Sequence, residues 1–567
     1  MPRISSGGRS PYRIVLGEDA SPSEVYAGEE LRKFIEEIGG CELPVVKELR
    51  EGERGIFLGD GPALRRLVGD GIDYGRLGEE GFVLRTVGPH IVISGGRRRG
   101  TLYGVYTFLE KYLGCRWYTP DVSKVPKVEA IDLPELDEEY LPSFEYREVF
   151  YAHAFDGDWA ARNKVNGSHM ELEERHGGKV KYSHFVHTFY QLVPPGRYFE
   201  EHPEYFSLVG GRRTAERAQL CLTNPDVLRI AAGEVFRWIE EDPEASIFSV
   251  SQNDWGGWCE CEICSEVDER EGARSGTIIS FVNEIAEKVA GMYTDKFIDT
   301  LAYQYSEDVP KHVRPHPQVI VRLCHMAPCC DSHPITSCEL NARYRRNLEG
   351  WTRISERVYI WHYVVNFAHY LMPFPNFNAI REDIPYYKEK GVKGIFCQGD
   401  YALGGGGEMA ELRAYILARL LWDVEVDVDE VMDDFLRGYY GRASGPIREY
   451  IDMLHSKVRD PEAHMNLYSS PYEVSYLTSE VLRKASDLFD EAERLADDDQ
   501  VAFRVEAARI PIEYARLALT SGYRVEDRKL VPGPDADEGQ LRRFAEMLKG
   551  HGIVQVSEGR SLEEFLP

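Results

Sequence analysis

The sequence of 567 residues has no run of about 18 uninterrupted apolar residues, the length that a membrane-spanning helix requires. It also lacks, in residues 1–8, the apolar core of a secretory signal peptide. Positive charge is scarce: 67 Lys and Arg residues face 95 Asp and Glu residues, and the net charge of −28 disfavours a nucleic-acid partner. We therefore expect a cytoplasmic protein that binds neither membranes nor nucleic acids.

Two phosphate-binding patterns are also missing. No Gly-x-Gly-x-x-Gly follows an expected strand, and the glycine-rich segment 95–100 lacks the Gly-Lys-Ser/Thr ending of a phosphate-binding loop. No low-complexity tract or fixed-period repeat is present, so we expect a globular chain. We also expect that its activity requires no cofactor. The oligomeric state stays open, and a homo-oligomer is one of the states that the sequence allows.

The length predicts two to four domains, and the spacing of apolar residues divides the chain into three regions. Residues 1–130 combine strands with two helices, at 24–38 and 100–113, and indicate a small α/β domain. Residues 119–142 are rich in Pro, Asp and Glu and are expected to form a linker. Residues 140–425 alternate strands with helices. Residues 426–567 change to helical periodicity and predict a helical C-terminal region.

The central region predicts an α/β fold, a (β/α)₈ TIM-like barrel. Helical patterns separate most of its expected strands, as parallel strands in a barrel require. An open doubly wound sheet is the alternative, which the missing dinucleotide motif disfavours. The eight strands are expected to begin near Phe144, His184, Gln219, Ile247, Phe297, Val319, Val358 and Gly394.

The segment 247–264 carries the strongest functional pattern. An apolar strand, Ile247–Val250, is followed by Asn253, Asp254 and Trp255. Two glycines, a second tryptophan and three cysteines come next. In a barrel, the carboxyl ends of the strands form the face that carries catalysis. Carboxylate and amide groups suit acid–base chemistry or hydroxyl binding, and indole rings suit sugar rings. The alternative is a polar loop with packed tryptophans.

The same argument selects polar residues at the other strand ends. An unpaired carboxylate is costly to bury, so the acids are the candidates for catalysis. Each residue also has a structural alternative: a histidine or Arg147 could be satisfied inside the barrel, and Glu408 could favour a helix N-terminus. The candidate catalytic residues are Asp254, Asp400 and Glu408, and the candidate substrate-binding residues are Arg147, His187, Asn253, Trp255, Tyr303, Tyr305, His362 and Tyr401.

The cysteines form a second pattern. Cys259, Cys261 and Cys264 lie within six residues, and Cys330 lies on the loop after the sixth strand, which could approach them. Thiolate clusters of this kind bind structural zinc. The spacing matches no standard zinc ribbon, and buried reduced thiols or disulfides are the alternatives.

The run Ser249–Cys264 resembles the signature of the DUF4838 proteins, some of which form glycoside hydrolase family 163. Four further segments, 301–305, 319–324, 366–370 and 411–423, are similar to motifs that this family carries in the same order. Residues 80–120, with Gly100–Tyr106, resemble the N-terminal domain found ahead of α-glucuronidase and β-hexosaminidase barrels.

The resemblance implies a barrel glycosidase. Characterised relatives are endo-β-N-acetylglucosaminidases in which one carboxylic acid protonates the leaving oxygen and a second carboxylate orients the substrate's acetamido group. Two positions depart from the family pattern, because His325 and Cys397 stand where many relatives carry an acid.

The leading prediction is a glycoside hydrolase acting on oligosaccharides that contain N-acetylamino sugars or uronic acids. Carboxylate acid/base catalysis, with assistance from the substrate's acetamido group as one variant, would carry the reaction. The departures at His325 and Cys397 motivate an alternative, a carbohydrate-binding barrel without catalysis. A metal-dependent enzyme that uses the Cys and His groups is a further alternative.

Overall fold

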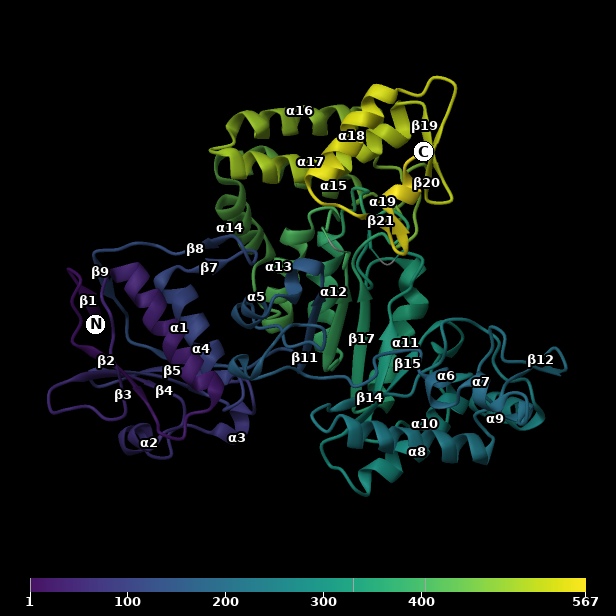
Figure 1. Ribbon diagram of the computed structural model, residues 1–567, viewed down its shortest axis with the longest axis horizontal. Coiled ribbons are helices and arrows are strands. Elements are labelled where there is room, and N and C mark those ends of the chain that lie inside the picture. Colours follow the sequence, from purple (N-terminus) through teal and green to yellow (C-terminus); the bar gives the residue numbers. More distant parts are fainter. Residues whose placement is uncertain (1, 330, 403) are drawn as a thin grey trace.

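The computed structural model describes residues 2–329, 331–402 and 404–567. An N-terminal α/β domain, a central parallel sheet with its surrounding helices and a C-terminal helical region follow one another along the chain (Figure 1). The α/β fold class is confirmed: the parallel strands form a half-barrel consistent with a TIM-like barrel.

The N-terminal domain is built on a six-stranded sheet in the order β10-β5-β6-β4-β2-β3. Helices α1 (Pro22–Gly39) and α4 (Gly100–Leu113) pack on one face, while α2 (Pro62–Val68) and α3 (Tyr74–Leu77) contribute to a smaller core on the other. The strands are β2 (Tyr12–Leu16), β3 (Val45–Val46), β4 (Arg54–Leu58), β5 (Phe82–Val87), β6 (His90–Gly95) and β10 (Asp137–Tyr140).

The expected linker at 119–142 is part of this domain. Strand β9 (Ala130–Asp132) pairs with β1 (Arg3–Ser6), and β10 adds an antiparallel edge strand to β5. The sequence did not predict β10, because its residues, Asp-Glu-Glu-Tyr, lack the apolar alternation of a buried strand. Exposed edge strands often carry charged side chains.

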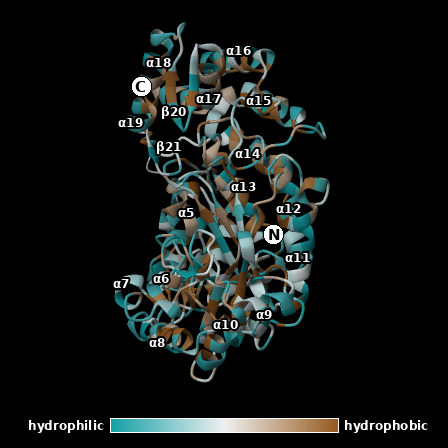
Figure 2. Cartoon of the chain, turned by 90° about the vertical axis from the view of Figure 1, so that its right-hand side faces the viewer, coloured by the Kyte–Doolittle hydropathy of each residue, from teal (hydrophilic) through white to brown (hydrophobic). Residues whose placement is uncertain are grey.

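The central sheet has the order β11-β18-β17-β16-β15-β14, and all its neighbouring strands are parallel. Hydrophilic residues lie on the outward surfaces of the helices that surround it (Figure 2). The strands are β11 (Tyr146–Phe150), β14 (Ile247–Ser249), β15 (Phe297–Ala302), β16 (Val319–Cys324), β17 (Arg357–Tyr363) and β18 (Gly394–Gln398). The helices between and after them include α8 (Pro225–Glu241), α10 (Ser275–Ala290), α11 (Ala342–Ile354), α12 (Phe377–Glu389) and α13 (Ala410–Trp422).

Two of the eight expected barrel strands are absent as regular strands from the described residues. The strand expected at His184 is reduced to a parallel bridge between Tyr182 and Ile247, and at Gln219 the chain forms only an antiparallel bridge outside the sheet. Irregular chain bridges β14 and β11 by backbone hydrogen bonds. The Ser249 N–H of β14 donates to the His184 carbonyl (3.2 Å), the Val180 N–H donates to the Asn166 carbonyl (2.8 Å), and the Asn166 N–H donates to the Arg147 carbonyl of β11 (3.0 Å). Irregular chain thus replaces strands on this side of the barrel.

Aromatic side chains fill the barrel interior. Alternate residues of a strand point to opposite faces, so every second residue of each strand faces inward. A buried ion pair, Arg322 with Asp299 at 3.1 Å, lies above this packing, and the Tyr182 hydroxyl donates to the same carboxylate (3.3 Å). The interior cluster contains Tyr146, Tyr182, Ile247, Ile320, Tyr359 and Phe396.

The C-terminal region begins with the expected helices: α14 (Val428–Tyr440), α15 (Ser444–Lys457), α16 (Ser479–Leu495) and α17 (Asp499–Thr520). Figure 1 shows the final part in yellow, with β21 near the upper ends of the barrel strands. No helix of the described chain has the length and apolar content needed to cross a bilayer. The final elements are β19 (Tyr523–Glu526), β20 (Lys529–Pro532), α18 (Glu538–Gly550), β21 (Gln555–Ser557), β22 (Arg560–Ser561) and α19 (Leu562–Phe565).

The hairpin β21–β22 docks on the loop that follows β17. The Glu558 N–H donates to the Phe367 carbonyl (2.9 Å), and the Tyr370 N–H donates to the Val556 carbonyl (3.0 Å). The last residues of the chain are therefore bonded to the carboxyl-end face of the barrel.

Candidate active site and cysteine cluster

Asp254 and Tyr303 meet at the carboxyl ends of β14 and β15. The Tyr303 hydroxyl donates a hydrogen bond of 3.0 Å to Asp254 Oδ1, and His187 Nε2 lies 3.9 Å from the same oxygen. His187 is oriented by its other nitrogen, which lies 2.8 Å from the Gln252 carbonyl. The side chain of Asp254 is 56% exposed. We call this end of the strands the barrel mouth.

Two residues at the mouth have left-handed backbone. His187 has φ 56° and Gln304 has φ 53°, although neither is a glycine. Such conformations cost on the order of 1–3 kcal/mol and cluster at functional sites. Both residues flank the Asp254–Tyr303 contact, so the fold holds this contact at a cost in stability.

A second carboxylate reaches the mouth from the C-terminal hairpin. Glu558 accepts hydrogen bonds from the Tyr401 hydroxyl (3.4 Å) and from Gln398 Nε2 (3.4 Å). Gln398 is itself fixed by Trp361, whose indole N–H donates to its side-chain oxygen (2.8 Å). No local sequence pattern indicated Glu558, because only the docking of the hairpin brings it to the barrel.

The environment of Glu558 favours its protonated form. Partial burial raises the pKa of Glu558, and the nearby negative charge of Asp254 adds to this rise. The hydrogen bond from Tyr401 and the positive charge of Arg528 oppose it. The mouth therefore combines one half-buried acid with a raised pKa and one exposed carboxylate, the arrangement in which two acids can take different roles.

A buried Glu–His pair lies on the β11 side of the mouth. Glu148 Oε1 lies 2.6 Å from His169 Nδ1, and the same carboxylate accepts the backbone N–H groups of Ser168 (3.1 Å) and His169 (2.9 Å). Glu148 is fully buried, whereas the His169 side chain is 35% exposed. Glu148 thus fixes the imidazole and leaves Nε2 as its polar atom towards solvent.

Half-buried aromatic rings lie between these polar groups. The Phe150 ring is 5.0 Å from the Tyr401 ring and 4.7 Å from the His169 ring, and the Phe185 ring is 5.5 Å from the Trp361 ring. Flat apolar surfaces surrounded by hydrogen-bonding groups match a sugar ring, which has apolar C–H faces and a rim of hydroxyl groups.

Two predicted acids do not lie at the mouth. Asp400 is 1% exposed and accepts the backbone N–H groups of Ala402 and Gly407 (3.0 Å each), so it shapes its own loop. Burial raises the pKa of Asp400 to about 6. Glu408 is buried in an ion pair with Arg413 Nη2 (2.6 Å). Neither Asp400 nor Glu408, the candidate partners of Asp254, has its carboxylate free for the mouth.

Arg147 and His362 also lie away from the mouth, because both point outward from their strands. Arg147 is fully buried against the N-terminal domain, where Nη1 donates to Glu80 Oε2 (2.7 Å). His362 is buried 5.3 Å from the His325 ring, and burial lowers its pKa to about 3. The alternate direction of strand side chains explains both corrections.

The remaining predicted residues differ in position. Tyr401 lies at the mouth with Tyr303 and His187. The Asn253 amide and the Trp255 indole both donate to the Ala218 carbonyl (3.0 and 2.8 Å), so they fix the loop. Tyr305 packs on Trp258, at 5.4 Å between rings, beside a separate cavity of about 510 Å³.

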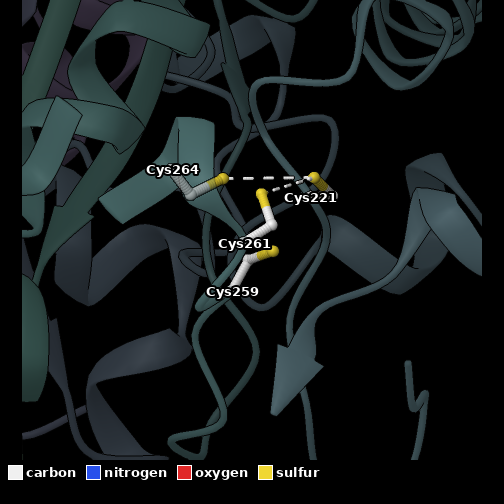
Figure 3. A group of neighbouring side chains, drawn as sticks. All are labelled: Cys221, Cys259, Cys261 and Cys264. Atoms are coloured by element: carbon white, nitrogen blue, oxygen red, sulfur yellow. Dashed lines mark hydrogen bonds between the residues drawn. The ribbon is translucent and has the colours of Figure 1, made fainter. Parts of the chain in front are cut away.

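The three predicted cysteines form a cluster, and its fourth member is Cys221. All four sulfur atoms lie within 4.8 Å of one another. Figure 3 shows Cys221 facing Cys261 and Cys264, at 3.7 and 4.0 Å, longer than the roughly 2.05 Å of a disulfide. The proposed ligand Cys330 lies outside the described residues.

The four-cysteine cluster could hold a structural metal, and two groups donate hydrogen bonds to one of its sulfur atoms. The Leu208 N–H lies 3.4 Å from Cys259 Sγ, and Arg213 Nη1 lies 3.5 Å from it. Hydrogen bonds from the neighbouring thiols Cys259 and Cys264 lower the pKa of Cys221, and the same contacts raise the pKa of Cys259 and Cys264, so Cys221 is the thiol that ionises first. Thiolates are the form that binds zinc, and four of them complete a tetrahedral site.

The fold is that of a glycoside-hydrolase-like barrel protein. The chain belongs to the family described as "Domain of unknown function (DUF4838)", which matches residues 117–452. Residues 7–108 match the N-terminus of glycosyl hydrolase family 67. Both parts of the predicted resemblance are thus confirmed. No curated protein matches the chain.

Several solved structures share the fold at low sequence identity. BtGH115A, a 4-O-methyl-α-glucuronidase of family GH115 with specificity for decorated arabinogalactans, is 12% identical with a TM-score of 0.60, over 97% of this chain and 76% of its own. A GH138 enzyme targeting pectin rhamnogalacturonan II is 11% identical with a TM-score of 0.51, over 95% and 73%. CpGH84D is 10% identical with a TM-score of 0.50, over 95% and 96%. At these identities the similarity concerns the fold alone.

Proposed function

We propose that this protein is a glycoside hydrolase that cleaves oligosaccharides containing N-acetylamino sugars or uronic acids. The observation that carries the proposal is the pair Asp254 and Glu558. Asp254 follows β14 in the middle of the chain and Glu558 lies in the C-terminal hairpin; the two acids act on each other electrostatically and lie beside half-buried aromatic rings. Family membership and the fold of the solved glycosidases support the same reaction class.

In the proposed reaction, Glu558 is the general acid. Its raised pKa extends the pH range in which Glu558 carries the proton that the glycosidic oxygen receives as the bond to the anomeric carbon breaks. Asp254, held by Tyr303, faces the positive charge that develops on the sugar ring.

The same Asp254–Tyr303 pair suits an N-acetylamino sugar. The carboxylate can accept the acetamido N–H. The phenol has a single proton, so on substrate binding it would transfer its hydrogen bond from Asp254 to the acetamido oxygen, which orients that oxygen towards the anomeric carbon. A uronic acid would instead place its carboxylate near a donor, and His169 and His187 offer imidazole nitrogens at the mouth. Comparing the rates of hydrolysis of an aryl N-acetylaminoglycoside and an aryl uronide tells which of the two sugars the protein cleaves.

The test compares Glu558→Gln and Asp254→Asn on two substrates of each sugar, one with a good phenolic leaving group and one with a poor alcohol. Loss of a general acid should reduce turnover of the poor leaving group by roughly 10²–10⁴-fold and of the good one far less. Asp254→Asn should reduce both. Glu563→Gln, an exposed glutamate of α19, is the matched control and should retain wild-type turnover.

Equal, small effects in both variants would reject this assignment of the acids. Binding of these glycans without turnover in the wild-type protein would instead favour the carbohydrate-binding barrel.

We further infer that the four-cysteine cluster holds a structural zinc ion. Four protein ligands leave no open position for water or substrate, and this favours a structural role over a metal-dependent reaction. The cluster fixes the loop 250–264, which carries Asp254, to the segment around Cys221.

A further inference from the structure

A second group of metal-ligating side chains lies between the central domain and the C-terminal region. It contains Cys329, His333 and Cys338 from the loop after β16, and His464 from the segment between α15 and α16. All four ligand atoms lie within 4.8 Å of one another, and both cysteines are buried. Neither histidine follows a conventional spacing from the cysteines.

The distances within this group fit a tetrahedral ion. Zn–S bonds of about 2.3 Å and Zn–N bonds of about 2.0 Å, at tetrahedral angles, place sulfur and nitrogen ligands about 3.5 Å apart. Cys329 Sγ lies 3.3 Å from His333 Nδ1 and 3.2 Å from His464 Nδ1, and Cys338 Sγ lies 4.0 Å from His464 Nδ1. Each of these separations is within about half an ångström of that ideal value.

The surroundings orient His333 as a ligand. Its Nε2 lies 3.0 Å from the Asp460 carbonyl, so Nε2–H donates there and Nδ1 keeps its lone pair towards the cysteines. Carbonyl partners of this kind fix the tautomer and direction of metal-bound histidines. The loop is fixed further by Ser332, whose hydroxyl oxygen accepts the Met465 N–H at 3.0 Å.

We propose that Cys329, His333, Cys338 and His464 form a second structural zinc site, which fastens the loop after β16 to the segment 458–478. The alternative, two thiols that only hydrogen-bond to imidazoles, would explain the contacts of Cys329. It would not require Cys338 to lie against the same His464 nitrogen.

The proposed site acts on the barrel mouth through a short chain of contacts. Beyond His464, the Leu467 carbonyl accepts the Phe367 N–H (2.8 Å). The carbonyl of the same Phe367 accepts the Glu558 N–H (2.9 Å). A zinc ion at His464 would therefore support the backbone on which the C-terminal hairpin docks.

The test is zinc content and zinc coordination in the full-length protein, reconstituted with zinc under reducing conditions. We expect two zinc ions per chain when zinc content is measured by inductively coupled plasma mass spectrometry. X-ray absorption at the zinc edge should give an average of three sulfur and one nitrogen ligands, the mean of a Cys₄ and a Cys₂His₂ site. This measurement needs no variant.

Variants assign the two sites. Cys338→Ser and His464→Gln should each leave one zinc ion bound by four sulfur atoms, whereas Cys264→Ser should leave one bound by two sulfur and two nitrogen atoms. Cys41→Ser, a buried cysteine of the N-terminal domain, is the control and should keep both ions. A single zinc ion with four sulfur ligands in the wild-type protein would overturn the proposal, as would unchanged zinc content in Cys338→Ser and His464→Gln.

Discussion

The hydroxyl of Tyr401 lies 3.4 Å from Glu558 Oε1, although 157 residues separate the two in the sequence. Tyr401 follows the last strand of the barrel, and Glu558 lies at the turn of a hairpin almost at the end of the chain. The contact joins the barrel to a region outside it, so the mouth is complete only when the C-terminal region is docked.

The first prediction concerns pH. A general acid must be protonated, so kcat/KM of the wild-type protein should fall as pH rises through the pKa of Glu558, which burial raises above its usual value. Glu558→Gln should lose this decline, because the glutamine side chain does not ionise. A pH profile of kcat/KM on the poor-leaving-group substrate measures it. An unchanged profile in the variant would assign the decline to another group.

The second prediction separates two neighbouring tyrosines. Tyr303→Phe removes the hydrogen bond to Asp254, and a bond to a charged acceptor contributes about 1.5–3 kcal/mol, so kcat/KM should fall roughly 10–100-fold. Tyr305→Phe is the matched control, because Tyr305 packs on Trp258 away from the mouth, and its kcat/KM should stay near that of the wild type. Equal losses in both variants would contradict the role of Tyr303.

The third prediction concerns the interface of the N-terminal domain and the barrel. Burial opposes ionisation of Glu80, but the guanidinium groups of Arg147 and Arg99 lower its pKa to about 2. Because the pKa of Glu80 is lower in the folded protein than in the unfolded chain, its ionisation stabilises the fold by roughly 3 kcal/mol at pH values above the unfolded pKa. This stabilisation is lost as the pH falls towards 2.

Glu80→Gln should therefore lower the free energy of unfolding at neutral pH by about 3–5 kcal/mol, since it leaves buried arginines without a carboxylate. Urea denaturation at pH 7 and pH 3 measures it. The difference between variant and wild type should be smaller at pH 3. A difference that does not change with pH would contradict the assigned pKa.

The fourth prediction concerns the ligands of the four-cysteine cluster. Cys221→Ser should lose that zinc ion as completely as Cys264→Ser, because both sulfur atoms belong to the same set. Cys330→Ser should retain it, because four other cysteines already complete the coordination. Zinc content after dialysis measures both. Retention in Cys221→Ser with loss in Cys330→Ser would restore the ligand set first expected from the sequence.

The fold was largely predictable because its signals are local. Strands β15 to β18 are apolar runs separated by amphipathic helices, and two of the family motifs, 301–305 and 319–324, begin on or coincide with β15 and β16. The missing barrel strands, near His184 and Gln219, lie in segments that form only isolated bridges, one to β14 and one outside the sheet. Nothing in a short window distinguishes such a segment from a regular strand.

The site was predictable only where it follows a strand. This rule selected Asp254, Tyr303, His187 and Tyr401, which lie at the mouth, and it also selected Arg147 and His362, whose side chains point away from the barrel. Whether a residue near a strand end faces inward depends on register, which the sequence does not show to within one position. Glu558 and Cys221 were missed because tertiary docking alone brings them to their sites.

The position of Glu558 has a practical consequence for cloning. The family match ends at residue 452, and a gene fragment cut at that boundary would encode the described barrel strands. It would omit Glu558, His464 and the hairpin that bonds to Phe367. An inactive fragment of this kind would be a product of the chosen boundary, and assays for new family members should begin from genes that extend beyond it.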